Sequence, residues 1–279
     1  MPVKLIAMDM DETFLRTDKT YDRERFKQIF KSLMERGIIF LVASGGSYHQ
    51  LREKFDKEEL DSIYFGADNG SFIVKKDEVL HSLGMPQTLY LDILDYIKKY
   101  KKTHPYISTG MASYIIKDDP TYKMAKLYNK ALYEIDDFSH IPADKLAYKI
   151  AIHHDVPLEE NKRMADDINQ QFPEVYTVTT GNNYVDATHK EATKGHVVEF
   201  LQNKYNILPS ETLAFGDSMN DLTMLNQAYY SIAMSNADPE LIKHSKYTIG
   251  NNNDQAALDI LEQFIKESSL DFLSSFKND

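Results

Sequence analysis

The sequence predicts an α/β fold, in which a core with an open, parallel β-sheet carries a second, α+β domain inserted in its chain. Residues 1–82 alternate strand-like and helix-like segments, which is the pattern of parallel βαβ units. Residues 83–188 have a different composition, which is rich in Tyr, His and charged residues. Residues 189–279 return to the first pattern. We therefore expect a core made of 1–82 and 189–279, interrupted by an inserted domain at 83–188.

The first core segment contains several strand signals and one long helix signal. The apolar run at residues 3–8 suits a strand that is buried on both faces. Asp22 is interpreted as the N-cap of a helix whose apolar residues recur at helical spacing until Gly37. Further strands are predicted at residues 38–44 and on either side of an Asn69-Gly70 turn within residues 63–76.

The other two segments are read in the same way. The inserted domain has two helical stretches and strand candidates at residues 113–117, 147–154, 175–180 and 184–188. The second core segment alternates helices at 194–205, 220–228, 238–245 and from about 254 with strands at 212–217, 229–234 and 247–250. This alternation predicts that the last segment adds more parallel strands to the core sheet.

The composition narrows the classes of function. The chain of 279 residues is 42% hydrophobic, carries a formal net charge of −11 and contains no cysteine. This charge argues against a general nucleic-acid or membrane binder, because both functions need clustered Lys and Arg. The start turns acidic too soon for a signal peptide, and no apolar run reaches the ~18 residues of a membrane span. We expect a cytoplasmic protein that binds small ligands and cations, with monomer or homodimer left open.

Carboxylates gather where predicted strands end. Asp9 and Asp11 follow the first strand, and Asp217 and Asp221 stand at the end of the strand at 212–217 or just beyond it. Ligands of open parallel sheets bind outside the carboxyl ends of the strands. Ser44 stands at a further strand end, where a hydroxyl and backbone N–H groups can bind an anion. Taken alone, Asp9, Asp11 and Ser44 are more typical of a turn or a helix cap, while Asp217 and Asp221 suit a structural and a functional role about equally.

Four short motifs in order give the chain a family resemblance. It resembles a haloacid dehalogenase-superfamily phosphatase, and the insertion resembles the cap of the Cof-like group, subclass IIB, also described as the C2B type. The resemblance implies a Rossmann-like core and covers nearly the whole length. The motifs are "DMDETFL" at 9–15, "VASGGS" at 42–47, "TKG" at 193–195 and "GDSMND" at 216–221.

The resemblance implies a Mg²⁺-dependent reaction on small phosphorylated metabolites. Asp9 matches the nucleophile that forms an aspartyl-phosphate, and Asp11 matches the general acid and base. The implied Mg²⁺ ligands are Asp9, the backbone carbonyl of Asp11, and Asp217, with Asp221 supporting them. The implied substrates are sugar phosphates first and phosphorylated cofactors such as pyridoxal phosphate or flavin mononucleotide next.

Other matching residues are implied to hold the phosphoryl group. Met10 offers its backbone rather than its side chain, while Ser44 and Gly45 are implied to bind the phosphoryl oxygens. Lys194 is implied to neutralise charge there and on the nucleophile, and Asn220 to support the metal and reach the phosphate. The inserted cap is implied to exclude water during phosphoryl transfer from the substrate and to admit it for hydrolysis.

Two positions depart from the family pattern, and other functions stay open. Glu12 stands where relatives commonly have Gly or Asp, and Gly46 stands where many have Arg. These departures bear on substrate preference, and whether Glu12 faces the site is an open question. The alternatives are a phosphomutase or phosphotransferase on the same scaffold, a receiver domain, which is normally far shorter, and a catalytically silent metabolite-binding protein.

Overall fold

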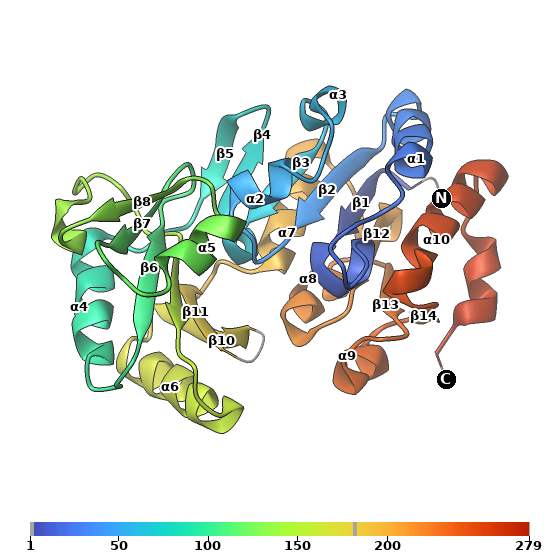
Figure 1. Cartoon of the computed structure of the whole chain (residues 1–279). Coiled ribbons are helices and arrows are strands. Elements are labelled where there is room, and N and C mark those ends of the chain that lie inside the picture. Colours follow the sequence, from blue (N-terminus) through green and yellow to red (C-terminus); the bar gives the residue numbers. More distant parts are fainter. Residues whose placement is uncertain (1–2, 181–182, 279) are drawn as a thin grey trace.

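The computed structural model of the chain describes residues 3–180 and 183–278. Residues 1–2 and 279, which fall within the predicted core, lie outside the described residues. The strands form two sheets, one of eight strands and one of six, and Figure 1 shows them as neighbouring bodies. We call them the core sheet and the cap sheet. Along the described chain, none of the helices has the length and apolar character needed to cross a membrane.

The core sheet is largely parallel, as the sequence predicts. Its strand order is β14-β13-β12-β1-β2-β3-β4-β5. Strands β3, β4 and β5 pair antiparallel at one side, and all the other neighbours are parallel. The bounds are β1 Leu5–Met8, β2 Ile39–Ala43, β3 Tyr64–Ala67, β4 Phe72–Lys75, β5 Glu78–Ser82, β12 Thr212–Gly216, β13 Tyr230–Met234 and β14 Tyr247–Ile249.

Strand β1 lies in the middle of the core sheet because both of its faces are apolar. Ile6 and Met8 pack in the hydrophobic cluster that contains residues of α1 and α10. Leu5 and Ala7 pack on the opposite face, with residues of α7, α8 and α9. The helices are α1 Arg23–Glu35, α2 Tyr48–Arg52, α3 Lys57–Leu60, α7 Lys194–Tyr205, α8 Leu222–Asn226, α9 Pro239–His244 and α10 Ala256–Glu267.

The cap sheet is built from the middle of the chain. Its order is β10-β11-β9-β6-β7-β8, antiparallel throughout except for the β7–β8 pair. Helices α4 Gln87–Ile97 and α6 Leu158–Gln171 pack on one of its faces, and α5 Tyr122–Tyr128 lies near β7 and β8. The strands are β6 His104–Ser108, β7 Ser113–Ile116, β8 Leu132–Ile135, β9 Lys149–His153, β10 Val175–Thr180 and β11 Tyr184–His189.

The sequence prediction missed three strands and found the hairpin. Strands β3 and β4 pair around a turn in which Asn69 has a φ of 58°, a backbone region that Asn adopts more readily than most residues. The missed strands are β5, β6 and β8. Strand β6 contains Pro105 although it pairs on both sides, and proline is rare in such strands because it lacks an N–H donor.

We propose that the two sheets are the cores of two domains, residues 1–82 with 189–279 and residues 83–188.

Candidate active site

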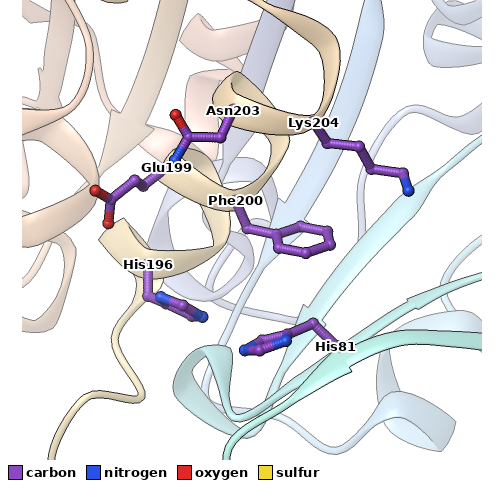
Figure 2. Close-up of a pocket in the computed structure, with 6 residues that line it drawn as sticks. All are labelled: His81, His196, Glu199, Phe200, Asn203 and Lys204. Carbon is purple, nitrogen blue, oxygen red and sulfur yellow. The ribbon is translucent and has the colours of Figure 1, made fainter.

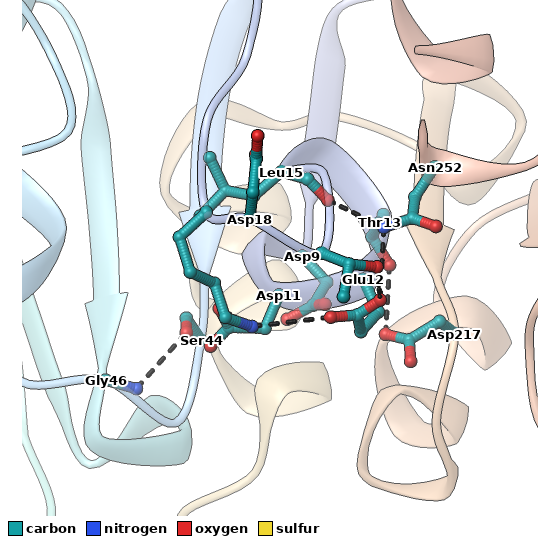
Figure 3. Close-up of polar contacts among 12 residues, drawn as sticks. Asp9, Asp11, Glu12, Thr13, Leu15, Asp18, Ser44, Gly46, Asp217 and Asn252 are labelled. Carbon is teal, nitrogen blue, oxygen red and sulfur yellow. Dashed lines mark hydrogen bonds and ion pairs between the residues drawn. The ribbon is translucent and has the colours of Figure 1, made fainter. Parts of the chain in front are cut away.

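The carboxyl ends of three neighbouring strands bring the predicted site residues together. Asp9 follows β1, Ser44 follows β2, and Asp217 follows β12. Because β12, β1 and β2 are adjacent and parallel, these ends share one edge of the sheet. Helix α7 begins at Lys194 and contributes the cation. Figure 3 shows Asp9, Ser44 and Asp217 converging from different elements.

Lys194 connects Asp9, the candidate nucleophile, to Asp221 in the segment that follows β12. Its Nζ donates to Asp9 Oδ1 at 2.5 Å and to Asp221 Oδ1 at 2.6 Å. Asp9 is 4% exposed and Lys194 is 2% exposed, so water screens these charges little. Lys194 therefore contacts two carboxylates from distant parts of the chain at once.

Asp221 also organises the loop that presents Asp217. Its Oδ2 accepts from the backbone N–H groups of Asp217 and Ser218, both at 3.0 Å. A Cβ at Gly216 would lie 2.5 Å from Asp221 Cβ, so only glycine permits this close return of the loop. The hydroxyl of Thr13 donates to Asp217 Oδ1 at 3.0 Å, a partner that sequence reasoning missed although it lies inside the first motif.

The buried carboxylates repel one another. Burial, followed by the nearby charge of Asp221, raises the pKa of Asp9 well above its ordinary value, although Lys194 acts in the opposite direction. Burial and Asp221 also raise the pKa of Asp217 to about 6. Three carboxylates against one ammonium leave a formal charge of −2 in this cluster, so the chain itself supplies too little positive charge.

The donor set fits a divalent cation. Asp9, Asp217 and Asp221 are the one group of three or more possible ligands that the described residues bring within 4.8 Å of one another, and no histidine belongs to it. Oxygen donors with a negative excess suit Mg²⁺ better than softer metals. Asp221 is occupied by Lys194 and two N–H groups, which leaves Asp9 and Asp217 as the freer ligands.

This geometry predicts an unusual pH dependence for the metal-free protein. Because the folded-state pKa of Asp217 lies at about 6, above its ordinary value, the protonated carboxyl is favoured in the fold. The associated stability is present at low pH and is lost as the pH rises from about 4 through 6. We expect the melting temperature in EDTA to fall by several degrees between pH 5 and 7.5, measured by scanning calorimetry.

The matched variant and the metal test the cause of this effect. The melting temperature of Asp217→Asn should fall less over the same pH interval, because the titrating carboxyl group is gone. Saturating Mg²⁺ should also flatten the change, since it stabilises the ionised carboxylates. An equal fall in wild type and variant, with or without Mg²⁺, would contradict the assignment of Asp217.

The loop after β2 contains the residues predicted to bind an anion. Ser44 is 2% exposed, and its Oγ accepts from the N–H of Gly46 at 3.1 Å, as Figure 3 shows. The N–H of Asn69 donates to the carbonyl of Ser44 at 2.9 Å, and Asn220 Nδ2 donates to Asn69 Oδ1 at 3.3 Å. Asn69, interpreted from sequence only as a turn residue, thus connects Ser44 with Asn220.

Asp11 and Glu12 lie at the mouth of the site. The Asp11 side chain is 63% exposed, and Lys19 Nζ lies 3.0 Å from its Oδ1. Glu12 accepts from Thr17 Oγ1 at 2.7 Å and from Asn252 Nδ2 at 3.2 Å, and Lys19 Nζ lies 3.4 Å from its Oε1. Met10 is buried behind them. Glu12 therefore holds the loop that carries Lys19, whose ammonium pairs with both carboxylates.

A cavity of about 270 Å³ joins this site to the cap sheet. Asn69, Lys194 and Asn220 line it from the core, while Tyr176 and other residues of β10 and β11 line it from the cap. Tyr176 and Met219 are 47% and 40% exposed, so the cavity offers apolar surface beside the charged cluster. A separate hollow of about 400 Å³ lies over α7 and β5, beside His81 and His196, and contains none of the acidic cluster (Figure 2).

The comparisons with known proteins agree with this arrangement. The sequence profile described as haloacid dehalogenase-like hydrolase matches residues 6–261. The 5-amino-6-(5-phospho-D-ribitylamino)uracil phosphatase of Escherichia coli (strain K12) is 30% identical over 96% of this chain and 98% of its own. The HMP-PP phosphatase of Cronobacter sakazakii is 23% identical over 96% of this chain and 98% of its own.

A solved structure shows the same architecture. The crystal structure of SMU.1108c from Streptococcus mutans UA159 superposes with a TM-score of 0.85 at 30% identity, covering 95% of this chain and 99% of that one. The profile match and the relative from Escherichia coli both span the core and cap sheets. The family resemblance drawn from the four motifs is thereby confirmed. The chain belongs to the haloacid dehalogenase-like hydrolases and is a phosphatase.

Proposed function

We propose that this phosphatase hydrolyses small phosphate monoesters through a covalent phosphate on Asp9, with Mg²⁺ as its cofactor. The observation that carries the proposal is the buried cluster around Asp9, in which Lys194 contacts both Asp9 and Asp221 and Asp217 lies within metal-binding distance of them. A bound Mg²⁺ would supply the positive charge that lets a carboxylate approach a phosphate.

The proposed first step transfers the phosphoryl group to the enzyme. One Asp9 oxygen forms a bond to phosphorus while the bond from phosphorus to the ester oxygen breaks. Asp11 gives its proton to the departing alkoxide. Ser44 and Gly45 hold the non-bridging oxygens, and Lys194 balances their charge. Asp11 is exposed at the mouth, where a group that exchanges protons with substrate and water belongs.

The proposed second step releases inorganic phosphate. A water molecule adds to phosphorus and loses a proton to Asp11, and the acyl phosphate bond breaks to restore the Asp9 carboxylate. The products are one alcohol and one phosphate ion. The cap sheet closes the side of the cavity that Tyr176 lines, which limits water during the first step.

The cavity supports a substrate class for this reaction. It is lined by the apolar residues Tyr176, Val178 and Met219 and by polar residues that include Asn69 and Thr188. Such a lining suits a polyol phosphate that carries a flat ring, because an aromatic side chain stacks on a ring while polar groups bind hydroxyls. The substrate in the name of the relative from Escherichia coli joins a phosphorylated ribityl chain to a uracil. We place such compounds first, with simple sugar phosphates and other phosphorylated cofactors after them.

A phosphate-release screen tests the proposal. We expect Mg²⁺-dependent release of inorganic phosphate from p-nitrophenyl phosphate, and higher kcat/KM for ring-bearing polyol phosphates than for simple sugar phosphates. Products should be analysed by phosphorus NMR as well as by phosphate assay. Isomerised sugar phosphate without free phosphate would favour the phosphomutase alternative, and the absence of any turnover with Mg²⁺ would contradict the proposal.

A further inference from the structure

A second buried charged cluster lies where the cap sheet meets the core. Lys149 on β9 lies 3.3 Å from Asp68 Oδ1 and 3.7 Å from Asp186 Oδ2 on β11. Asp68 follows β3 of the core sheet, so its ion pair with Lys149 crosses from the cap sheet to the core sheet. Asp68 is fully buried, and Lys149 and Asp186 are each 4% exposed. None of the three belongs to the acidic cluster around Asp9.

The alternation of the strands directs this cluster toward the core. Ile150 and Val185 pack in the cluster that contains residues of helices α4 and α6. Their neighbours Lys149 and Asp186 therefore point to the other face of the cap sheet. Ser108, which pairs with Lys149 in the sheet register, faces the same way and donates to Asp68 Oδ2 at 2.7 Å. A run of polar side chains thus leaves the cap sheet and contacts the core.

Lys149 also contacts the loop after β2, which contains Ser44, Gly45 and Gly46, directly. Its Nζ donates to the carbonyl oxygen of Gly45 at 2.5 Å. That carbonyl belongs to the same planar peptide as the N–H of Gly46, and this N–H donates to Ser44 Oγ at 3.1 Å. One peptide of the loop is therefore held at both ends, by the cap lysine at its oxygen and by Ser44 at its nitrogen.

The hold on this peptide sets the direction of the Ser44 hydroxyl. A hydroxyl has one proton to donate and two lone pairs to accept with. Because Gly46 N–H occupies one lone pair of Ser44, the hydroxyl proton is left to donate elsewhere. If the Gly45–Gly46 peptide turned over, its carbonyl would face Ser44 and take that proton. The orientation that Lys149 holds is the one that keeps a donor for an anion.

We propose that Lys149 is a positioning residue for the phosphate-binding loop, which makes the phosphate site depend on the docked cap sheet. The inference rests on the proposed function, in which Ser44 and Gly45 bind the transferring phosphoryl group. The Lys149 ammonium donates to Gly45, while Asp68 and Asp186 are its ion-pair partners. When the cap sheet lifts, Lys149 leaves with it, and the peptide loses the partner that fixes its orientation.

The environment keeps Lys149 charged, as this role requires. Burial lowers the pKa of Lys149, but the charges of Asp186 and Asp68 outweigh burial, and the net effect raises the pKa. An ammonium is a stronger donor to a carbonyl than a neutral amine. The two carboxylates thus maintain the charge that the Gly45 contact uses.

The test compares a double variant that keeps the wild-type charge of the cluster with a single variant that keeps Lys149. Removing Lys149 alone leaves two buried carboxylates without their cation, which can unfold a protein. The double variant Lys149→Met/Asp186→Asn keeps the formal cluster charge of −1, because one charge of each sign is removed. Asp186→Asn alone is the reference, since it retains the contact between Lys149 and Gly45. Both are assayed with Mg²⁺ for p-nitrophenyl phosphate kinetics and for inhibition by orthovanadate, a phosphate mimic too small to reach the ring-binding residues of the cap.

The expected result is a loss at the phosphate site. Relative to Asp186→Asn, the double variant should lose about ten- to a hundredfold in kcat/KM, and its orthovanadate inhibition constant should rise by a similar factor. Lys126→Met is the control, because Lys126 also donates to backbone carbonyls but within the cap. It should leave both values unchanged.

The outcomes separate this inference from the proposed function. If the double variant matches the reference in kcat/KM and in orthovanadate inhibition, Lys149 has only a structural role and the inference is wrong. A lower melting temperature with unchanged inhibition has the same meaning. If the wild-type protein shows no Mg²⁺-dependent turnover, the proposed function fails, and the inference fails with it.

Discussion

Asp9→Asn should abolish turnover without unfolding the protein. The substitution keeps the shape of the side chain but removes the nucleophilic oxygen and one proposed metal ligand. We expect phosphate release to fall by at least about 10⁴-fold, as is typical when a nucleophile is removed. Release is measured with p-nitrophenyl phosphate at saturating Mg²⁺. The melting temperature should be unchanged or higher, because burial and the neighbouring carboxylates already disfavour the ionised form of Asp9 and raise its pKa.

The control for this prediction keeps the site and changes a carboxylate outside it. Glu12 lies next to the motif but is held by Thr17 and Asn252, so Glu12→Gln should retain most of the turnover. Circular dichroism and thermal melts establish that both variants are folded. Substantial phosphate release by folded Asp9→Asn would remove Asp9 as the nucleophile.

Lys194→Met should damage both stability and activity. It removes the ammonium that contacts Asp9 and Asp221 and leaves three carboxylates within 4.8 Å of one another. Removing one partner of a buried ion pair costs about 3–5 kcal/mol, which the metal-free protein should show in urea unfolding. Activity should fall at least about a hundredfold, because the charge on the transferring phosphoryl group loses a fixed cation.

Magnesium distinguishes this explanation from a general packing defect. Mg²⁺ should raise the melting temperature of Lys194→Met more than that of the wild-type protein, because the variant has more uncompensated negative charge for the ion to neutralise. Lys204→Met serves as the control, since Lys204 lies near the other end of α7 and is exposed. An equal Mg²⁺ response in the wild-type protein and Lys194→Met would mean that the destabilisation arises elsewhere.

The core of the fold was predictable because its strands are buried on both faces. Runs such as Leu5–Met8 and Ile39–Ala43 are apolar throughout, and the helices between them carry apolar residues at helical spacing. The cap sheet was harder to predict. Strand β8 has exposed residues in its middle, and β6 includes Pro105. The residues of strand β5 are exposed or half-buried, so no run of buried apolar residues marks the strand in the sequence.

The candidate site was predictable where each residue belongs to a short local motif. The sequence pointed to Asp9, Lys194 and Asp217, and the structure places them in one cluster or beside it. Contacts between segments that are distant in the sequence could not be predicted, because no local sequence pattern marks them. Asn69 looked like an ordinary turn residue, and Lys149 looked like one charge in a strand. The role of Asn69 depends on how separate segments of the core meet, and that of Lys149 depends on how the cap sheet contacts the core. One sequence encodes neither as a local pattern.

The central position of β1 constrains the order in which the protein assembles during synthesis. Its partner β2 follows within about forty residues, but its other partner, β12, begins at Thr212. Every strand of the cap sheet lies between His104 and His189, so that sheet can be completed while one side of β1 still waits for its neighbour. Asp9 likewise meets Lys194 only after 185 further residues have been made. The site around Asp9 is thus assembled late, after all the strands of the cap sheet have been made.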